Sequence, residues 1–230
     1  MRLTNLTLGV VALALGGAAT AHAQQPTQPS GQVYAVTYFE VSPSAAGETA
    51  ALARQYAAVS RKEPGNAGFD ALEEIARPGR FATLEAWQDK SAADAHAAAA
   101  KTFEAKLQAE LISPFDVRLS SGLSIAAPKA QPGADAVYVL THVDVVPAGK
   151  DETQQLAEAL AAAARAEPGN LWFDVLQQAN RPNHFTLVEG WRNRDAFATH
   201  IDTPSTRQFR NKLTPLQGAL YDERLYRAVR

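Results

Sequence analysis

The chain contains one long internal repeat. The segment from Tyr34 to His96 recurs without a gap from Tyr138 to His200, and 25 of the 63 aligned positions are identical. Solenoid proteins repeat their units roughly every 20 to 50 residues. The offset here is 104 residues, so the repeat predicts two tandem copies of one small domain.

The first residues have the order of a secretory signal. Met1 and Arg2 precede an apolar stretch from about residue 6 to residue 19, and Ala21-His22-Ala23 supplies the small residues of a cleavage site. We therefore predict a signal peptide over residues 1–23, a disordered leader over residues 24–32, and a periplasmic or secreted mature protein. The apolar stretch is short for a membrane span of about 20 residues, so an uncleaved anchor is the weaker alternative.

The composition excludes several kinds of site. The chain has no cysteine, so it holds no disulfide, thiolate nucleophile or thiolate-bound metal. Its four histidines beyond the signal peptide are never four residues apart, and glycine-rich nucleotide motifs are absent. We therefore predict no metal and no cofactor. The net charge is −2 with interspersed signs, so we expect no nucleic-acid partner and no stable membrane association.

Each copy has the pattern of the same six elements in the order β-α-β-β-α-β. Apolar, β-branched runs predict the strands, and the first helix of each copy ends at Glu-Pro-Gly-Asn. The second helix is predicted to begin at a cap formed by Ser91 with Asp94, or by Asp195 in the second copy. In the first copy we expect strands at 33–41, 69–76, 81–87 and 115–119, and the first helix at 48–62. The second copy is expected to match them, with 137–146, 152–166 and 221–226 as its first strand, first helix and last strand.

This order is that of a ferredoxin-like domain in the α+β class, in which both helices cover one face of an antiparallel sheet. The other face is apolar and needs a partner, and the nearest partner is the sheet of the other copy. We therefore predict a domain at residues 33–125, a linker at 126–136, a domain at 137–230, and an apolar interior between the two sheets.

The motifs of each copy, taken in order, resemble the antibiotic biosynthesis monooxygenase (ABM) domain family. The resembling residues are Glu63, Pro64, Gly65, Phe69, Arg77, Pro78, Phe81, Glu85, Trp87 and His96, and in the second copy Glu167, Pro168, Gly169, Phe173, Arg181, Pro182, Phe185, Glu189, Trp191 and His200. The resemblance implies a dimeric α/β barrel, formed here within one chain as a monomeric pseudo-dimer that can still self-associate. Family members include cofactor-free oxygenases of quinols and polycyclic phenols, and haem-degrading relatives.

The chain departs from the family pattern in its second helices. Ser205 stands where many members have a second histidine after Thr-Pro. The axial haem ligand of the haem-degrading relatives aligns with Leu107 and Leu213, and neither first strand contains the asparagine that those relatives use. Haem degradation is therefore not expected.

A cofactor-free oxygenase needs an apolar pocket and a base that deprotonates the substrate. His96 and His200 occupy equivalent positions on the second helix, although buried structural histidines would show the same pattern. The second copy also has His142 where the first has Tyr38. This difference fits one working half and one supporting half, but sequence drift after duplication would give the same pattern. The candidate bases are His200, His142 and His96. The candidate substrate-binding residues are Trp191, Trp172, Trp87, Phe173, Phe197 and Arg181.

These observations predict an exported, cofactor-independent monooxygenase that uses molecular oxygen on a small quinol or polyphenol. The main alternative is a non-catalytic barrel that binds an apolar or aromatic ligand. A third hypothesis is haem binding without degradation.

Overall fold

The computed structural model describes residues 31–230. The predicted signal peptide and residues 24–30 of the predicted leader lie outside this part. Within residues 31–230, no helix is long and apolar enough to cross a membrane. The same residues contain no group of three or more His, Cys, Asp or Glu side chains placed to hold a metal ion.

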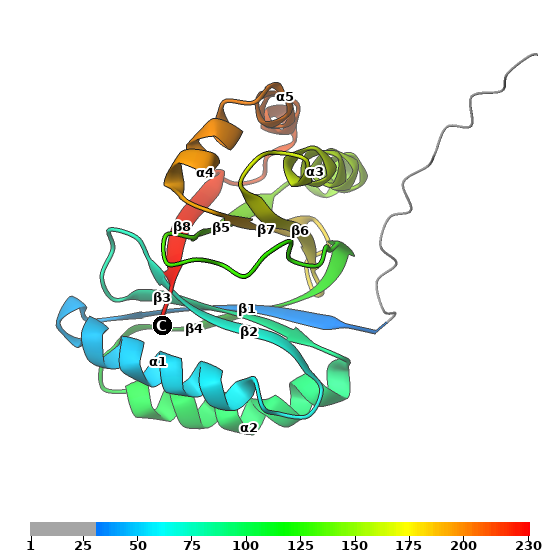
Figure 1. Ribbon diagram of the computed structural model, residues 1–230. Helices are drawn as coiled ribbons and strands as arrows, with labels where there is room; N and C mark the ends of the chain where they lie inside the picture. Colours follow the sequence, from blue (N-terminus) through cyan, green and yellow to red (C-terminus); the bar gives the residue numbers. More distant parts are fainter. Residues whose placement is uncertain (1–30) are drawn as a thin grey trace, which may run out of the picture.

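Each half of the chain forms a four-stranded antiparallel sheet with its helices on one face (Figure 1). The first half contains β1 (Val33–Val41), α1 (Ala46–Ser60), β2 (Asn66–Glu74), β3 (Arg80–Trp87), α2 (Lys90–Leu107) and β4 (Leu111–Ser124). The second half contains β5 (Val137–Asp144), α3 (Lys150–Arg165), β6 (Asn170–Gln178), β7 (His184–Trp191), α4 (Arg194–Ile201), α5 (Pro204–Leu213) and β8 (Asp222–Ala228).

The two sheets join into one closed barrel, with the strand order β1-β3-β2-β8-β5-β7-β6-β4. The last strand of each half makes the connection. β4 pairs with β1 of its own half and then with β6, while β8 pairs with β5 and with β2. The predicted α+β ferredoxin-like fold and its intramolecular barrel are therefore confirmed.

Alternation along the strands divides the apolar side chains into three clusters. One cluster lies in the barrel interior, and Tyr34, Leu72, Tyr138 and Trp172 belong to it. The other two clusters lie between each sheet and its own helices. The interior cluster is shared by both halves, so neither half can bury its inner face alone.

The helix caps differ from those predicted. The predicted caps at Ser91 and Asp195 are wrong, because α2 and α4 begin before these residues. The caps are Asp89 and Asn193, whose side chains accept hydrogen bonds from the backbone N–H of the third residue along the chain at 2.8 and 2.9 Å. Both caps have extended backbone, which is the conformation that an N-cap requires.

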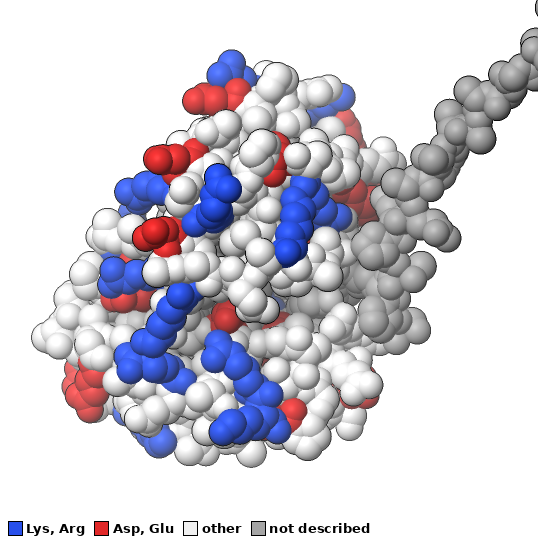
Figure 2. Space-filling model, viewed as in Figure 1, with Lys and Arg blue, Asp and Glu red and all other residues white. Residues whose placement is uncertain are grey.

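Several strand boundaries also differ, and β2 begins at Asn66 and ends at Glu74 instead of at residues 69 and 76. β5 ends at Asp144 instead of residue 146, because Val145 only forms an isolated bridge to Gln217. β4 is much longer than the five residues predicted, because it begins at Leu111, paired with Val41 of β1, and continues past β1 to pair with β6. On the face shown in Figure 2, basic side chains are spread over both halves with acidic side chains between them.

Candidate functional site

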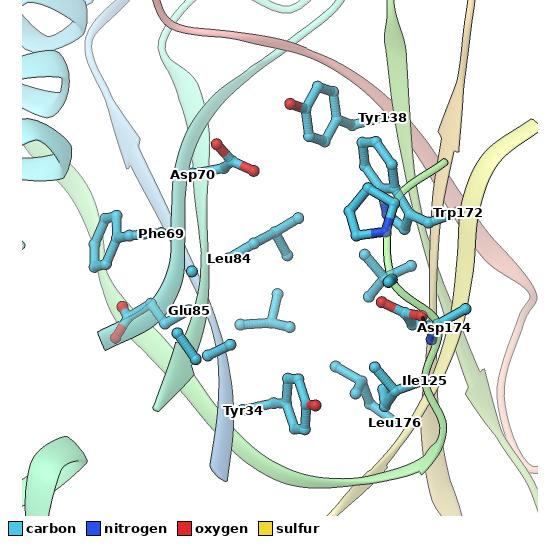
Figure 3. Close-up of a pocket in the computed structure, with 18 of the residues that line it drawn as sticks. Tyr34, Phe69, Asp70, Leu84, Glu85, Ile125, Tyr138, Trp172, Asp174 and Leu176 are labelled. Carbon is cyan, nitrogen blue, oxygen red and sulfur yellow. Dashed lines mark hydrogen bonds between the residues drawn. The ribbon is translucent and has the colours of Figure 1, made fainter. Parts of the chain in front are cut away.

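A cavity of about 430 Å³ lies at one end of the barrel interior, between the two sheets (Figure 3). Its size falls within the range of roughly 300 to 1,000 Å³ that is usual for small-molecule sites. Apolar side chains form much of its wall, among them Leu84, Leu176 and Ile125. Figure 3 shows that Phe69 and Glu85, on β2 and β3, point away from this space. Their backbone borders the cavity, and their side chains lie under the helices.

The repeat gives the cavity two equivalent rows of residues. In the first half Gly68, Ala86 and Tyr34 lie side by side on β2, β3 and β1. In the second half Trp172, Gly190 and Tyr138 occupy the matching places on β6, β7 and β5. The row of the second half is filled by the indole of Trp172, which meets the Tyr138 ring edge to face at 5.1 Å.

Two equivalent aspartates, Asp70 on β2 and Asp174 on β6, also line the cavity. Each lies near the arginine that ends the preceding helix. Arg61 donates to Asp70 Oδ1 at 3.1 Å, whereas Arg165 Nη2 lies 3.9 Å from Asp174 Oδ1. The Asp70 side chain is 40% exposed and that of Asp174 is 18% exposed. The second aspartate is thus more buried and less well paired.

Burial is the main cause that raises the pKa of Asp174, to about 7. A hydrogen bond from the Ala126 backbone N–H and the charge of Arg165 act in the opposite direction but do not cancel it. Burial also raises the pKa of Asp70, against the lowering effect of Arg61. At neutral pH the Asp174 carboxyl is therefore divided between its protonated and ionised forms, which suits a group that accepts and returns a proton.

Each aspartate acts electrostatically on the tyrosine of the other half. Burial, and then the charge of Asp174, raises the pKa of Tyr34 to about 12. Burial, and then the charge of Asp70, raises the pKa of Tyr138. Each tyrosine–aspartate pair thus combines β1 or β5 of one half with β6 or β2 of the other, so the site exists only when the barrel is closed.

The segment between β4 and β5 covers part of the cavity. Its lining residues are Ile125, Ala126, Ala127, Pro128, Gln131 and Pro132. The Lys129 N–H donates to the Leu171 carbonyl at 2.9 Å, and the Arg230 side chain donates to the Pro132 carbonyl at 2.7 Å. The same segment holds one oxygen of Asp174, which accepts a hydrogen bond from the Ala126 backbone N–H at 2.9 Å.

The model of the family described as "Antibiotic biosynthesis monooxygenase" matches residues 32–105 and 136–212, which together make up more than half of the chain. The chain belongs to the ABM family. It is 34% identical to "Putative monooxygenase YcnE" of Bacillus subtilis over 86 residues, which are 37% of this chain and 90% of that protein.

Two further comparisons place this ABM protein among its relatives. It is 28% identical over 93 residues to an uncharacterized protein of Synechocystis, and the match covers 40% of this chain and 63% of that protein's length. The solved structure of a "Putative monooxygenase" from Fusobacterium nucleatum superposes on this chain with a TM-score of 0.79 at 16% identity. It covers 88% of this chain and 94% of its own. At that identity the likeness concerns the fold.

Most of the residues that the sequence predicts for the site lie on the other side of the sheets from the cavity. His96 and His200 are buried between sheet and helices, with the rings of Trp87 and Trp191 at 4.6 Å from the respective imidazoles. The predicted wall residues Phe173 and Phe197 belong to the same helix-side cluster as Trp191. None of these six side chains lines the barrel cavity.

Both histidines of this ABM protein are held by carboxylates in hydrogen-bonded networks. His96 Nδ1 lies 2.9 Å from Glu63 Oε2, and His200 Nδ1 lies 3.0 Å from Glu167 Oε2. The Glu-x-Trp motif completes each network, since Trp191 Nε1 donates to Glu189 Oε2 at 2.8 Å and Trp87 Nε1 donates to Glu85 Oε2 at 3.0 Å. The imidazoles have one further partner each, since His96 Nε2 lies 2.6 Å from the Tyr56 hydroxyl and His200 Nε2 lies 3.2 Å from Thr206 Oγ1.

The remaining predicted residues divide between three places. Trp172 lines the cavity, as described above, whereas Arg181 is exposed in the β6–β7 hairpin. His142 lies deeper along the barrel beside Tyr38, at 5.1 Å between ring centroids. Burial, and then the charge of Arg118, lowers the pKa of His142 to about 3, which makes this imidazole a weak proton acceptor.

Sequence reasoning did not select Asp70 and Asp174, although a signal was present. The dipeptide Phe-Asp follows the Glu-Pro-Gly-Asn turn in both copies. An aspartate retained twice within an apolar strand pattern points inward if its neighbouring phenylalanine points to the helices. The alternation of side chains along a strand shows that the phenylalanine and the aspartate point to opposite faces of the sheet. It does not show which face borders a cavity.

Proposed function

We propose that this ABM protein is an exported, cofactor-independent monooxygenase acting on a small quinol or polyphenol, with Asp174 as its general base. The observation that carries the proposal is the Asp174 carboxyl, whose pKa is raised to about 7 at the wall of an aromatic cavity. Membership of a monooxygenase family supports the type of reaction. The N-terminal sequence supports export, and fractionation of cells followed by N-terminal sequencing of the mature protein tests it.

The reaction requires a base and a shielded space. Asp174 removes the proton of a phenolic hydroxyl, and the phenolate passes one electron to molecular oxygen. The substrate radical and superoxide then form a carbon–oxygen bond, giving a hydroperoxide. The ring carbon that carries the hydroperoxide loses its hydrogen as a proton while the oxygen–oxygen bond breaks. One oxygen atom becomes a carbonyl and the other leaves as water, whose two protons come from the hydroxyl and the ring carbon.

The cavity offers the other conditions that such a reaction needs. Tyr34, Tyr138 and Trp172 present aromatic rings to a planar substrate, and the segment 125–132 limits the entry of water. Exclusion of water protects the radical pair and strengthens the interaction of the carboxylate with the phenolic proton. These features support a quinol or polyphenol in preference to an aliphatic substrate.

Asp174→Asn is expected to lower oxygen consumption by roughly 100-fold or more, because an amide cannot accept the phenolic proton. In the unsubstituted protein, kcat/KM should rise with pH through about pH 7, where Asp174 loses its proton, and this step should be absent in the variant. The measurement is oxygen uptake by the purified mature protein against a panel of quinols and polyphenols, corrected for autoxidation.

Three further variants sharpen this test. Asp70→Asn is the matched control from the first half, and its effect should be much smaller because Asp70 is bonded to Arg61. Loss of uptake in His142→Ala or His200→Ala, with uptake retained in Asp174→Asn, would instead identify a histidine as the base. Uptake at the autoxidation rate throughout, with ligand binding intact, would indicate the non-catalytic binding barrel.

A further inference from the structure

The two halves differ most sharply inside the cavity, at a pair of positions that changed together. The first half has Gly68 opposite Ala86, and the second half has Trp172 opposite Gly190. The two pairs follow the same strand irregularity in β2 and β6, so their backbone positions correspond. A large side chain on one strand thus accompanies the loss of a side chain on its neighbour.

The glycine at position 190 makes room for the indole of Trp172. A Cβ atom added at Gly190 would lie 2.4 Å from three atoms of that ring, which no real contact permits. The Trp172 side chain crosses Gly190 and reaches Tyr138, where the two rings meet at 67°. In the second half, then, a planar bicyclic ring already occupies the space beside the tyrosine.

The corresponding space in the first half is open. A Cβ atom added at Gly68 would meet only the Ala86 Cβ, at an ordinary 3.7 Å. The φ angle of Gly68 is not positive, so its backbone conformation does not require glycine. Gly68, Ala86 and Tyr34 all line the cavity. Asp174, the candidate base, lines the same cavity.

We propose that the barrel contains two equivalent subsites, of which Trp172 fills one permanently, and that the protein therefore binds one aromatic ring system per chain beside Tyr34, Gly68 and Ala86. The indole shows the shape that the open subsite accepts, namely a planar ring system of about two fused rings. Trp172 and Gly68 are accordingly the residues that set ligand number and ring size. This inference rests on the proposed use of the cavity for an aromatic ligand, but not on catalysis.

The repeat supplies its own test. The double variant Gly68→Trp with Ala86→Gly copies the arrangement of the second half into the first, and should weaken binding of 2-naphthol by roughly tenfold or more because the new indole occupies its place. The double variant Trp172→Gly with Gly190→Ala should instead open the second subsite. Isothermal titration calorimetry under argon should then give two molecules of 2-naphthol per chain where the unsubstituted protein binds one.

The outcomes separate this inference from the proposed reaction. Thermal melting and circular dichroism verify that each variant is folded, and the opened variant tests the proposal even if the filled one does not fold. A stoichiometry that stays at one in the opened variant, unchanged affinity in the filled one, or no binding of 2-naphthol by the unsubstituted protein overturns the inference. If 2-naphthol binding changes as expected but the protein consumes no oxygen, the two-subsite inference is supported and the monooxygenase proposal is rejected.

Discussion

Replacing Trp191 by alanine will lower the free energy of unfolding by about 3 to 5 kcal/mol, the range usual for loss of a large buried aromatic side chain. Trp191 is 0% exposed and packs against His200 and Phe197 between the sheet and α4. The substitution leaves a void there and also removes the N–H that Glu189 accepts. Urea denaturation at pH 7, fitted with a common m-value, measures the loss.

Trp172→Ala is the matched control for this prediction. Trp172 is nearly as buried, at 7% exposed, but its ring borders the open cavity and not a closed core. Enlarging an existing cavity forfeits fewer contacts than creating a new one, so the loss should stay below about 2 kcal/mol. Equal losses in the two variants would show that the cavity wall is as closely packed as the core under the helices.

Replacing Glu189 by glutamine will remove a large part of the pH dependence of stability between about pH 5 and pH 8. Burial is the main cause that raises the pKa of Glu189 to about 8, although the Trp191 N–H opposes the shift. The unfolded chain releases this proton near the ordinary pKa of about 4.3. Between these two values the folded state binds more protons than the unfolded state, so stability falls as pH rises.

The slope from one such group approaches about 1.4 kcal/mol per pH unit and vanishes above about pH 8, where both states have lost the proton. Glutamine carries no proton to release, yet its amide oxygen can still accept from Trp191. Urea denaturation at a series of pH values should therefore give a flatter curve for Glu189→Gln. Part of the slope will remain, because Asp174 contributes in the same direction up to about pH 7. The control is Glu48→Gln on the exposed surface of α1, which should leave the curve of stability against pH as it is in the unsubstituted protein. The prediction is contradicted if Glu189→Gln also gives the curve of the unsubstituted protein.

The predictable part of this protein is what depends on local pattern. The copy number follows from the repeat, and the order of elements and the turns at Glu-Pro-Gly-Asn follow from neighbouring residues. The structure has this order, with the second helix of the second half divided into α4 and α5. Errors arose where an element depends on a distant one. β4 is longer than its local pattern indicates because its first residues pair with β1, and its last residues pair with β6 of the other half, more than 50 residues away in the sequence.

The candidate site was harder to predict for the same reason. His96 and His200 stand out in the sequence because they recur in a protein with few histidines, but each is enclosed by a glutamate, a tryptophan and a helix. Asp174 is inconspicuous in the sequence. Its raised pKa arises from burial by the strands of both halves and by the segment 125–132.

The amino-acid sequence by itself determined that two ferredoxin-like halves form and that one face of each sheet is left apolar, because strand alternation and helix signals are local. Only the tertiary structure decided where the cavity lies and which groups surround it. Closing the barrel places Tyr34 of one half and Asp174 of the other in the wall of one cavity, and the pairing of β6 with β7 places Trp172 over Gly190. Cavities and shifted pKa values depend on contacts between residues that are distant along the chain, and no local pattern encodes them.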